Sequence, residues 1–280
     1  MDKAGIIALL TEDLKDEHGA IIQYLNHAYG MGEGEIACEI EAVARDEMRH
    51  LDWLAETITE LGGTVNLERG KMRMGGALVP DWMRNDVFLE EGAIAQYREH
   101  IKAIDDPKIK RLLERILADE QAHRDVFGHF TEKTAAEGSR DVTGNRQDKT
   151  VEVINRSIGH EYTVVLQYLL HSYLSTDAEG KKQLEDQAVN EMQHMGWLAE
   201  GMVSSGGKPV IEHFEVDRST KFTDMLHADI KIEREVSEAY DRAAQEAEDP
   251  DLKKLFLRMR DNEIYHAEVF SDLLEKAEKE

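Results

Sequence analysis

Two pairs of glutamate and histidine, each spaced by three residues, occur in the first half of the chain. Glu47 and His50 lie in EMRH, and Glu120 and His123 lie in EQAH. Residues three apart on a helix are roughly 60° apart around its axis and one turn apart along it, so each pair presents a carboxylate and an imidazole to the same partner. Such a pair can ligate a metal ion. One pair alone predicts little, because acid-rich helices contain many that are solvated.

A lone glutamate precedes each pair on an otherwise apolar helical face. Glu17 is followed seven residues later by Tyr24, and Glu90 is followed by Tyr97 at the same spacing. This shared spacing selects Glu90 over its neighbour Glu91. The order Glu, Glu-x-x-His, Glu, Glu-x-x-His on four successive helices is typical of the inward-facing ligands of dinuclear carboxylate bundles.

The six residues of this pattern predict a dinuclear metal site. Buried carboxylates without cations repel one another and retain protons, whereas two divalent ions neutralise four negative charges. The oxygen-rich ligand set is hard, which favours iron, with manganese as the alternative, over a thiolate-type zinc site. Cys38 is the only cysteine, so we expect no cysteine-bound iron–sulfur, rubredoxin-like or zinc-ribbon unit.

The same pattern recurs in the second half. HLDWLAE at 50–56 matches HMGWLAE at 194–200 with an offset of 144, whereas the Asp-Pro dipeptides at 106–107 and 249–250 are offset by 143. One residue has therefore been lost between the second and third helices of the second copy. The corresponding ligands are Glu161, Glu191, His194, Glu233, Glu263 and His266, with Tyr168 and Tyr240 at the tyrosine positions. We interpret the chain as a tandem duplication with a complete site in each copy.

Apolar residues recur at helical spacing in eight segments, which predicts an all-α fold of two four-helix bundles. The predicted helices span 5–29, 34–61, 83–104 and 107–136, then 148–174, 178–205, 221–246 and 249–279. About twenty irregular residues between the second and third helices can run the full height of a bundle, so those two helices are predicted to be parallel. The predicted domains are residues 1–137 and 138–280, joined through the polar segment 134–150.

The first half resembles bacterioferritin and its ferritin-like relatives over nearly its whole length. The resemblance rests on EHGAIIQY, on DEMRH followed by a long helix and Gly-Gly, and on ILADEQAH, and the second half is a more divergent copy. It implies two tandem ferritin-like bundles related by a pseudo-two-fold. It also implies bridging roles for Glu47 and Glu120, terminal roles for Glu17 and Glu90, and one metal each for His50 and His123.

The residues behind the histidines differ between the copies. In bacterioferritin-like proteins an aspartate just before each Glu-x-x-His serves the histidine of the opposite helix, a role that the resemblance assigns to Asp46 and Asp119. The second copy has Asn190 and Asn262 instead. An amide accepts the hydrogen bond but carries no charge, so we expect a less basic imidazole and a different metal affinity or redox behaviour in the second site. Neutral drift is the alternative.

Met48 and Met192 directly follow the first Glu of the second helix in each copy. In bacterioferritin the methionine at this position ligates a haem shared between two subunits, so the resemblance implies that the two thioethers could clasp one haem b across the internal pseudo-two-fold. Methionine is also a common core residue, and both interpretations stay open.

The remaining tyrosines and histidines receive weaker assignments. Tyr24, Tyr97, Tyr168 and Tyr240 are expected either to bond a terminal glutamate, to donate an electron to the metals, or to be ordinary core residues. Other histidines have no matching motif and are expected at the surface or in packing; examples are His18, His100, His160 and His171.

The expected activity is oxidation of Fe(II) with O2 or H2O2, as in a ferroxidase of iron homeostasis or oxidative stress. A peroxide-scavenging di-iron or di-manganese enzyme uses the same ligands, and a metal- or haem-binding protein without activity is the non-enzymatic alternative. A substrate oxidase has no support in the sequence. No convincing fifth helix follows either copy, so we expect a small particle, with a homo-oligomer open, rather than a closed storage shell.

The overall charge limits the other partners. The chain carries 58 acidic and 34 basic residues, a formal charge of −24, which repels nucleic acid and anionic membranes and attracts cations. No apolar run approaches the ~18 residues of a spanning helix, and a lone cysteine fits a reducing compartment. We therefore expect a soluble, cytoplasmic protein.

Overall fold

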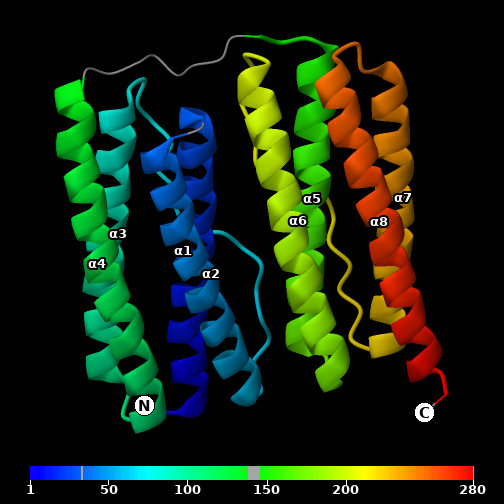
Figure 1. The fold of residues 1–280 in the computed structure, drawn as a ribbon. Helices are drawn as coiled ribbons and strands as arrows, with labels where there is room; N and C mark the ends of the chain where they lie inside the picture. Colours follow the sequence, from blue (N-terminus) through cyan, green and yellow to red (C-terminus); the bar gives the residue numbers. More distant parts are fainter. Residues whose placement is uncertain (33, 138–145, 280) are drawn as a thin grey trace. The chain divides into compact units, whose positions relative to one another are not determined.

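The computed structural model describes residues 1–32, 34–137 and 146–279, and these residues form eight α-helices and no strand (Figure 1). The helices are α1 (Lys3–Met31), α2 (Glu35–Glu60), α3 (Val79–Ala103), α4 (Pro107–Glu137), α5 (Lys149–Leu174), α6 (Ala178–Ser204), α7 (Phe222–Glu246) and α8 (Pro250–Ala277). The chain divides into two compact units, Met1–Thr143 and Gly144–Glu280, called unit 1 and unit 2 below. The predicted domain boundary lies between residues 137 and 138, at the start of the segment 138–145, which is outside the described residues.

The prediction of an all-α fold with two tandem four-helix bundles is confirmed. In unit 1, α1 packs along α2 and α3 packs along α4, with smaller contacts between α1 and α3 and between α2 and α4. Unit 2 repeats this arrangement with α5 to α8. Within the described part of the chain, α2 and α3 do not pack against each other, so they occupy diagonal corners of the bundle.

Most helix ends lie within two residues of their predicted positions. The start of α3 is an exception, because the helix begins at Val79 rather than at 83. Pro80 stands in its first turn, where proline's missing N–H leaves no intrahelical bond unmade. The Trp82 indole donates to the Gly76 carbonyl, 3.0 Å away, and ties the start of α3 to the connection between α2 and α3.

The long connection between α2 and α3 lies along α1. The Gly70 amide donates to the Lys15 carbonyl at 2.6 Å, and the Arg73 amide donates to Gln23 Oε1 at 2.6 Å. The contact at Gly70 is so close that an added Cβ would lie 2.8 Å from the Asp16 Cα, so only glycine fits. These bonds hold the connection along α1, the helix that carries Glu17.

The same attachment occurs in unit 2. The Asp217 amide donates to Gln167 Oε1 at 3.0 Å, and both residues are 144 positions beyond the Arg73 and Gln23 pair of unit 1. Residues on α7 are offset by 143, as with Glu233 against Glu90. The residue missing from the second copy was therefore lost between position 217 and the buried part of α7.

None of the helices in the described ranges has the length and apolar character needed to cross a membrane.

Candidate dimetal sites

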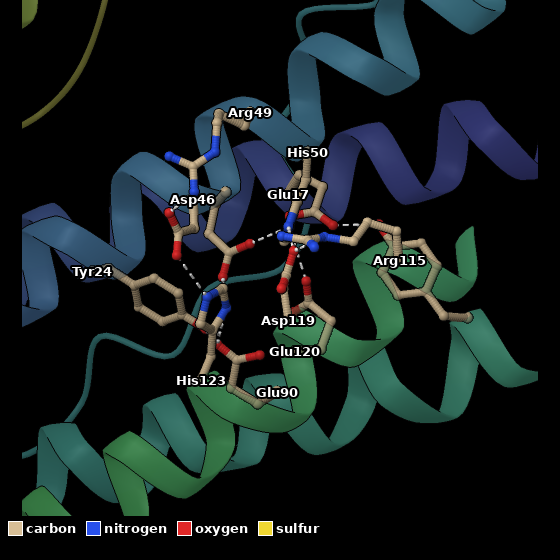
Figure 2. Close-up of polar contacts among 12 residues, drawn as sticks. Glu17, Tyr24, Asp46, Arg49, His50, Glu90, Arg115, Asp119, Glu120 and His123 are labelled. Carbon is tan, nitrogen blue, oxygen red and sulfur yellow. Dashed lines mark hydrogen bonds and ion pairs between the residues drawn. The ribbon is translucent and has the colours of Figure 1, made fainter. Parts of the chain in front are cut away.

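Glu47 is a fully buried carboxylate on α2. Side chains from the other three helices of unit 1 gather near it, and Figure 2 labels them as Glu17, Glu90, Glu120 and His123. Glu47 Oε2 lies 2.8 Å from His50 Nδ1 on the same helix, and Glu47 Oε1 lies 2.9 Å from His123 Nδ1 on α4. Glu120 Oε1 lies 2.9 Å from His50 Nδ1. The Glu-x-x-His spacing thus turns each imidazole toward a carboxylate of its own helix or of the opposite helix.

The ligand atoms of unit 1 form two overlapping groups, each with all its atoms within 4.8 Å of one another. One group contains Glu17 and His50, and the other contains Glu90 and His123. Glu47 and Glu120 belong to both groups. Two metal ions can therefore sit side by side, with two shared carboxylates between them and one carboxylate and one imidazole at each end.

Unit 2 brings together the corresponding six residues. His194 Nδ1 lies 2.7 Å from Glu191 Oε2 and 3.1 Å from Glu263 Oε1, and His266 Nδ1 lies 2.5 Å from Glu191 Oε1. Glu191 and Glu263 are shared by the two ligand groups, while Glu161 and Glu233 each belong to one. All six ligand side chains are buried.

Burial and crowding control the protons of the metal-free site. Burial, together with repulsion from Glu47, raises the pKa of Glu17 to about 8, and burial followed by repulsion from neighbouring carboxylates raises the pKa of Glu90 and Glu120. Burial alone would lower the pKa of His123, but attraction to Glu47 outweighs it and raises the pKa to about 9. The site therefore holds protons where a metal would place positive charge.

The residues present fit divalent metal ions. Glu90 Oε2 and Glu233 Oε2 are buried and accept no hydrogen bond, although an unpaired buried carboxylate oxygen is costly. Glu90 belongs to the same ligand group as His123, and Glu233 belongs to the same ligand group as His266. A hard divalent cation would satisfy the oxygens and neutralise the charge at once.

Each tyrosine donates its hydroxyl to the terminal glutamate of the neighbouring helix. Tyr24 on α1 donates to Glu90 on α3, and Tyr97 on α3 donates to Glu17 on α1. In unit 2, Tyr168 donates to Glu233 and Tyr240 donates to Glu161. Bonding a terminal glutamate is one of the roles expected for the tyrosines. These bonds fix one oxygen of each terminal carboxylate.

Two aspartates lie behind the histidines of unit 1 (Figure 2). Asp119 Oδ2 lies 3.4 Å from His50 Nε2, and Asp46 Oδ2 lies 3.4 Å from His123 Nε2, so each aspartate faces the histidine of the opposite helix. Arg115 donates to Asp119 at 3.0 Å and Arg49 donates to Asp46. We call the ligand set of unit 1 site 1 and that of unit 2 site 2. Site 1 therefore has an outer layer of charged aspartate and arginine side chains, which extends to the solvent.

The outer layer of site 2 is different. The Asn262 amide group lies 2.9 Å from His194 Nε2, whereas the Asn190 amide donates to Gln187 Oε1 at 3.0 Å. Arg258, at the position of Arg115, stacks over the Trp197 ring at 4.0 Å. When Nδ1 of His194 binds a metal, Nε2 carries the proton, so the Asn262 amide must present its oxygen.

Met48 and Met192 are both partly exposed on the second helix of their own unit. The haem prediction remains a prediction.

A second buried polar cluster in each unit was not anticipated from the sequence. In unit 1, Asp86 lies on α3 one turn before Glu90, and its Oδ1 accepts from the Gln23 amide at 2.8 Å and lies 2.9 Å from His27 Nδ1. The His27 ring also stacks on Trp82. The cluster ties α1 to α3 beside the metal ligands and, through Gln23, holds the connection from α2.

Unit 2 has the same cluster, which corrects the assignment of His171. His171 is fully buried, with Nδ1 2.9 Å from Asp229 Oδ1, and Gln167 donates to Asp229 at 2.8 Å. His18 and His100 are also buried, which agrees with the packing alternative expected for them. A usable signal was present: the glutamine, histidine and aspartate recur at offsets of 144, 144 and 143, as the ligands do.

We expect the substitution Asp86→Ala to lower the free energy of unfolding by about 3 kcal/mol, because it leaves the buried His27 and Gln23 without a shared acceptor. The comparison is urea denaturation of the metal-free full chain, followed by circular dichroism. Asp125→Ala is the matched control, since Asp125 pairs with Arg124 on the surface of the same unit, where an ion pair contributes ~0–1 kcal/mol. Equal losses in the two variants would contradict the assignment.

Comparison with known proteins finds a family match in both halves of the chain. A family model described as the ferritin-like domain matches residues 7–136 and again residues 151–279. A bacterioferritin of Desulfovibrio desulfuricans is 35% identical over 127 residues, which are 43% of this chain and 71% of that protein. The bacterioferritin BfrA of Mycobacterium tuberculosis is 32% identical over 129 residues, which are 44% of this chain and 80% of that protein.

Solved bacterioferritin structures also match. One from Mycobacterium tuberculosis has 29% sequence identity and a TM-score of 0.46, covering 49% of this chain and 90% of that one. One from Desulfovibrio desulfuricans, whose diiron site was solved in different catalytic states, has 31% identity and a TM-score of 0.45, covering 52% of this chain and 94% of that one. The family match spans most of both units, and the chain therefore belongs to the ferritin-like family, with two ferritin-like domains in tandem.

Proposed function

We propose that this chain is a di-iron carboxylate protein that oxidises Fe(II) with O2 or H2O2. The observation that carries the proposal is the pair of carboxylates shared between two ligand groups in each unit, Glu47 with Glu120 and Glu191 with Glu263. Shared carboxylates hold two ions close together, as an electron-transferring pair requires. The similarity to bacterioferritins, including one with a diiron site, supports iron as the metal.

Two ferrous ions held by Glu17, Glu47, His50, Glu90, Glu120 and His123 would supply two electrons to the oxidant. The surrounding residues keep these ligands in place. Tyr24 and Tyr97 hold the terminal carboxylates from the opposite side of the bundle. Asp46 and Asp119 face the Nε2 atoms of the histidines, which favours the proton on Nε2 once a metal ion has displaced the proton from Nδ1.

The test of this proposal is anaerobic loading of the full chain with Fe(II), followed by rapid mixing with O2 or with H2O2. Rapid formation of ferric absorbance over repeated additions of iron is expected. The relative rates with the two oxidants separate a ferroxidase from a peroxide-scavenging enzyme. Iron oxidation no faster than in protein-free buffer would leave only a non-enzymatic metal-binding function.

We also propose that the two sites differ in affinity. Site 1 has Asp46 and Asp119 behind its histidines, whereas Asn262 faces His194 in site 2 and Asn190 bonds elsewhere. A carboxylate behind a ligand histidine makes the imidazole a better donor than an amide does. Site 1 should therefore bind divalent metal more tightly.

The exchange of these residues tests the difference in affinity. Asn190→Asp/Asn262→Asp is expected to tighten metal binding at site 2 by about tenfold, and Asp46→Asn/Asp119→Asn is expected to weaken site 1 by a similar factor. Calorimetric titration of the metal-free chains with Co(II) measures both. Identical affinities of the two sites in the wild type, unchanged by either exchange, would support neutral drift instead.

A further inference from the structure

A cavity of about 260 Å³ lies between α1 and α3 of unit 1 and reaches the metal ligands. Glu17, Glu90 and Glu120 form part of its lining. Ala20 and Ala93 also line it, each three residues after a terminal glutamate and therefore on the same face of its helix. Their small side chains leave the space beside the ligands open.

Two carboxylates outside the ligand set line the same cavity. Gln96 Nε2 donates to Asp13 Oδ1 at 3.0 Å and to Asp16 Oδ2 at 2.9 Å, so the amide joins the two aspartates. Asp13 is 1% exposed, and His100 Nδ1 lies 2.8 Å from its Oδ1. Its Oδ2 is buried and accepts no hydrogen bond. A buried carboxylate oxygen with no partner is costly unless a proton or a cation neutralises it.

The balance of charge around the cavity favours cations. Lys71 and Arg73 of the connection from α2 also line it, and the Arg73 guanidinium lies over the Phe88 ring, 3.3 Å from its centroid. Five carboxyl groups line the cavity against these two basic groups, and carboxyl groups release their protons when a cation binds to them. A cavity lined mainly by one sign of charge concentrates ions of the opposite sign and speeds their capture.

We propose that divalent cations reach site 1 through this cavity, with Asp13 and Asp16 as a transit binding site, and that site 2 lacks this route. Asp13 and Glu17 are four residues apart on α1, so their Cβ atoms are about 5–6 Å apart. This inference rests on the metal-binding function proposed above.

Unit 2 lacks the aspartates at the corresponding positions. Ser157 and His160 stand 144 positions beyond Asp13 and Asp16. The His160 ring packs against Phe214, with ring centroids 4.9 Å apart. Burial, together with repulsion from a nearby arginine, lowers the pKa of His160, so this side chain supplies none of the negative charge that Asp16 supplies in unit 1.

Unit 2 also lacks the small side chains. Val164 stands at the position of Ala20 and Val236 stands at the position of Ala93. Val164 is 2% exposed and Val236 is 3% exposed, each three residues after a terminal glutamate. Branched apolar side chains therefore fill the space that is open in unit 1, and cations should reach site 2 more slowly.

The test measures the rate of Co(II) uptake at one site at a time in the full chain. Glu191→Gln/Glu263→Gln leaves only site 1, and Glu47→Gln/Glu120→Gln leaves only site 2. Stopped-flow absorbance of bound Co(II) reports uptake without any oxidation. We expect the chain with site 1 to load at least about tenfold faster than the chain with site 2.

Variants of the cavity residues separate the route from the site itself. In the site 1 chain, Asp13→Asn/Asp16→Asn should slow uptake about tenfold while the final amount of bound Co(II) is unchanged. Ala20→Val/Ala93→Val should also slow it, and Val164→Ala/Val236→Ala should accelerate uptake in the site 2 chain. Glu39→Gln/Glu91→Gln is the charge-matched control at two exposed positions of unit 1 and should leave the rate unchanged.

The outcomes distinguish this inference from the function on which it rests. Failure of either single-site chain to bind Co(II) at equilibrium would count against the metal sites themselves. Normal binding at equal rates in both chains, with no effect of the aspartate and alanine variants, would overturn the route and leave the metal sites intact.

Discussion

Replacing Glu47 with glutamine is expected to halve the metal content of the chain. Both oxygens of Glu47 face ligand histidines, at 2.8 Å from His50 and 2.9 Å from His123, and Glu47 belongs to both ligand groups of unit 1. A neutral amide removes one negative charge from each metal position and cannot bridge two ions as a carboxylate does. Unit 2 keeps its own ligands, so its two ions should remain bound.

The measurement is metal analysis of the dialysed Glu47→Gln chain after loading with iron or manganese. Glu91→Gln is the matched control, because Glu91 is exposed on α3 beside the ligand Glu90 and should leave the metal content unchanged. Full metal content in Glu47→Gln would show that Glu47 is not a metal ligand. Loss of all metal would show that the two units do not bind independently.

The metal-free protein is expected to lose stability as the pH rises from about 6.5 to about 9. Burial and repulsion from Glu47 raise the pKa of Glu17 to about 8, and attraction to Glu47 outweighs burial and raises the pKa of His123 to about 9. Both groups bind protons more tightly in the folded state. Their contribution is therefore complete below their unfolded pKa values and is lost as the pH rises through the folded ones.

The expected loss is a few kcal/mol in the free energy of unfolding, since each pKa unit corresponds to about 1.4 kcal/mol. Urea denaturation in a chelator at pH 6.5, 7.5 and 9 measures it. Glu17→Gln should flatten the part of the slope below pH 8, because the amide does not titrate. A free energy of unfolding that is constant or rises over this range would show that the ligands do not hold protons in the metal-free site.

The helical fold followed from the sequence because period, length and repetition agreed. Each of the eight predicted segments is helical, and the start of α3 was missed by four residues because Pro80 was taken as part of the connection rather than of the first turn. The path of the connection between α2 and α3 could not be predicted from the sequence. It depends on single contacts, such as Gly70 against Lys15, that carry no periodic signal.

The convergence of the candidate ligands could be predicted because a dinuclear site needs a fixed chemical set at fixed helical spacing, and the chain contains that set twice. The buried His27 and Asp86 pair was missed because its members come from different helices and form no local motif. The cavity beside site 1 was also missed. It depends on where Ala20 and Ala93 meet across two helices, and small residues have no distinctive pattern in a helical sequence.

The central claim is that each unit holds a complete dinuclear site, and metal analysis of the purified, iron-loaded chain tests it most directly. Four ligand groups, two in each unit, predict four ions per chain. An optical spectrum of the same sample would show a Soret band if haem is bound as well. Two ions per chain or fewer, under conditions in which a bacterioferritin loads fully, would contradict the claim.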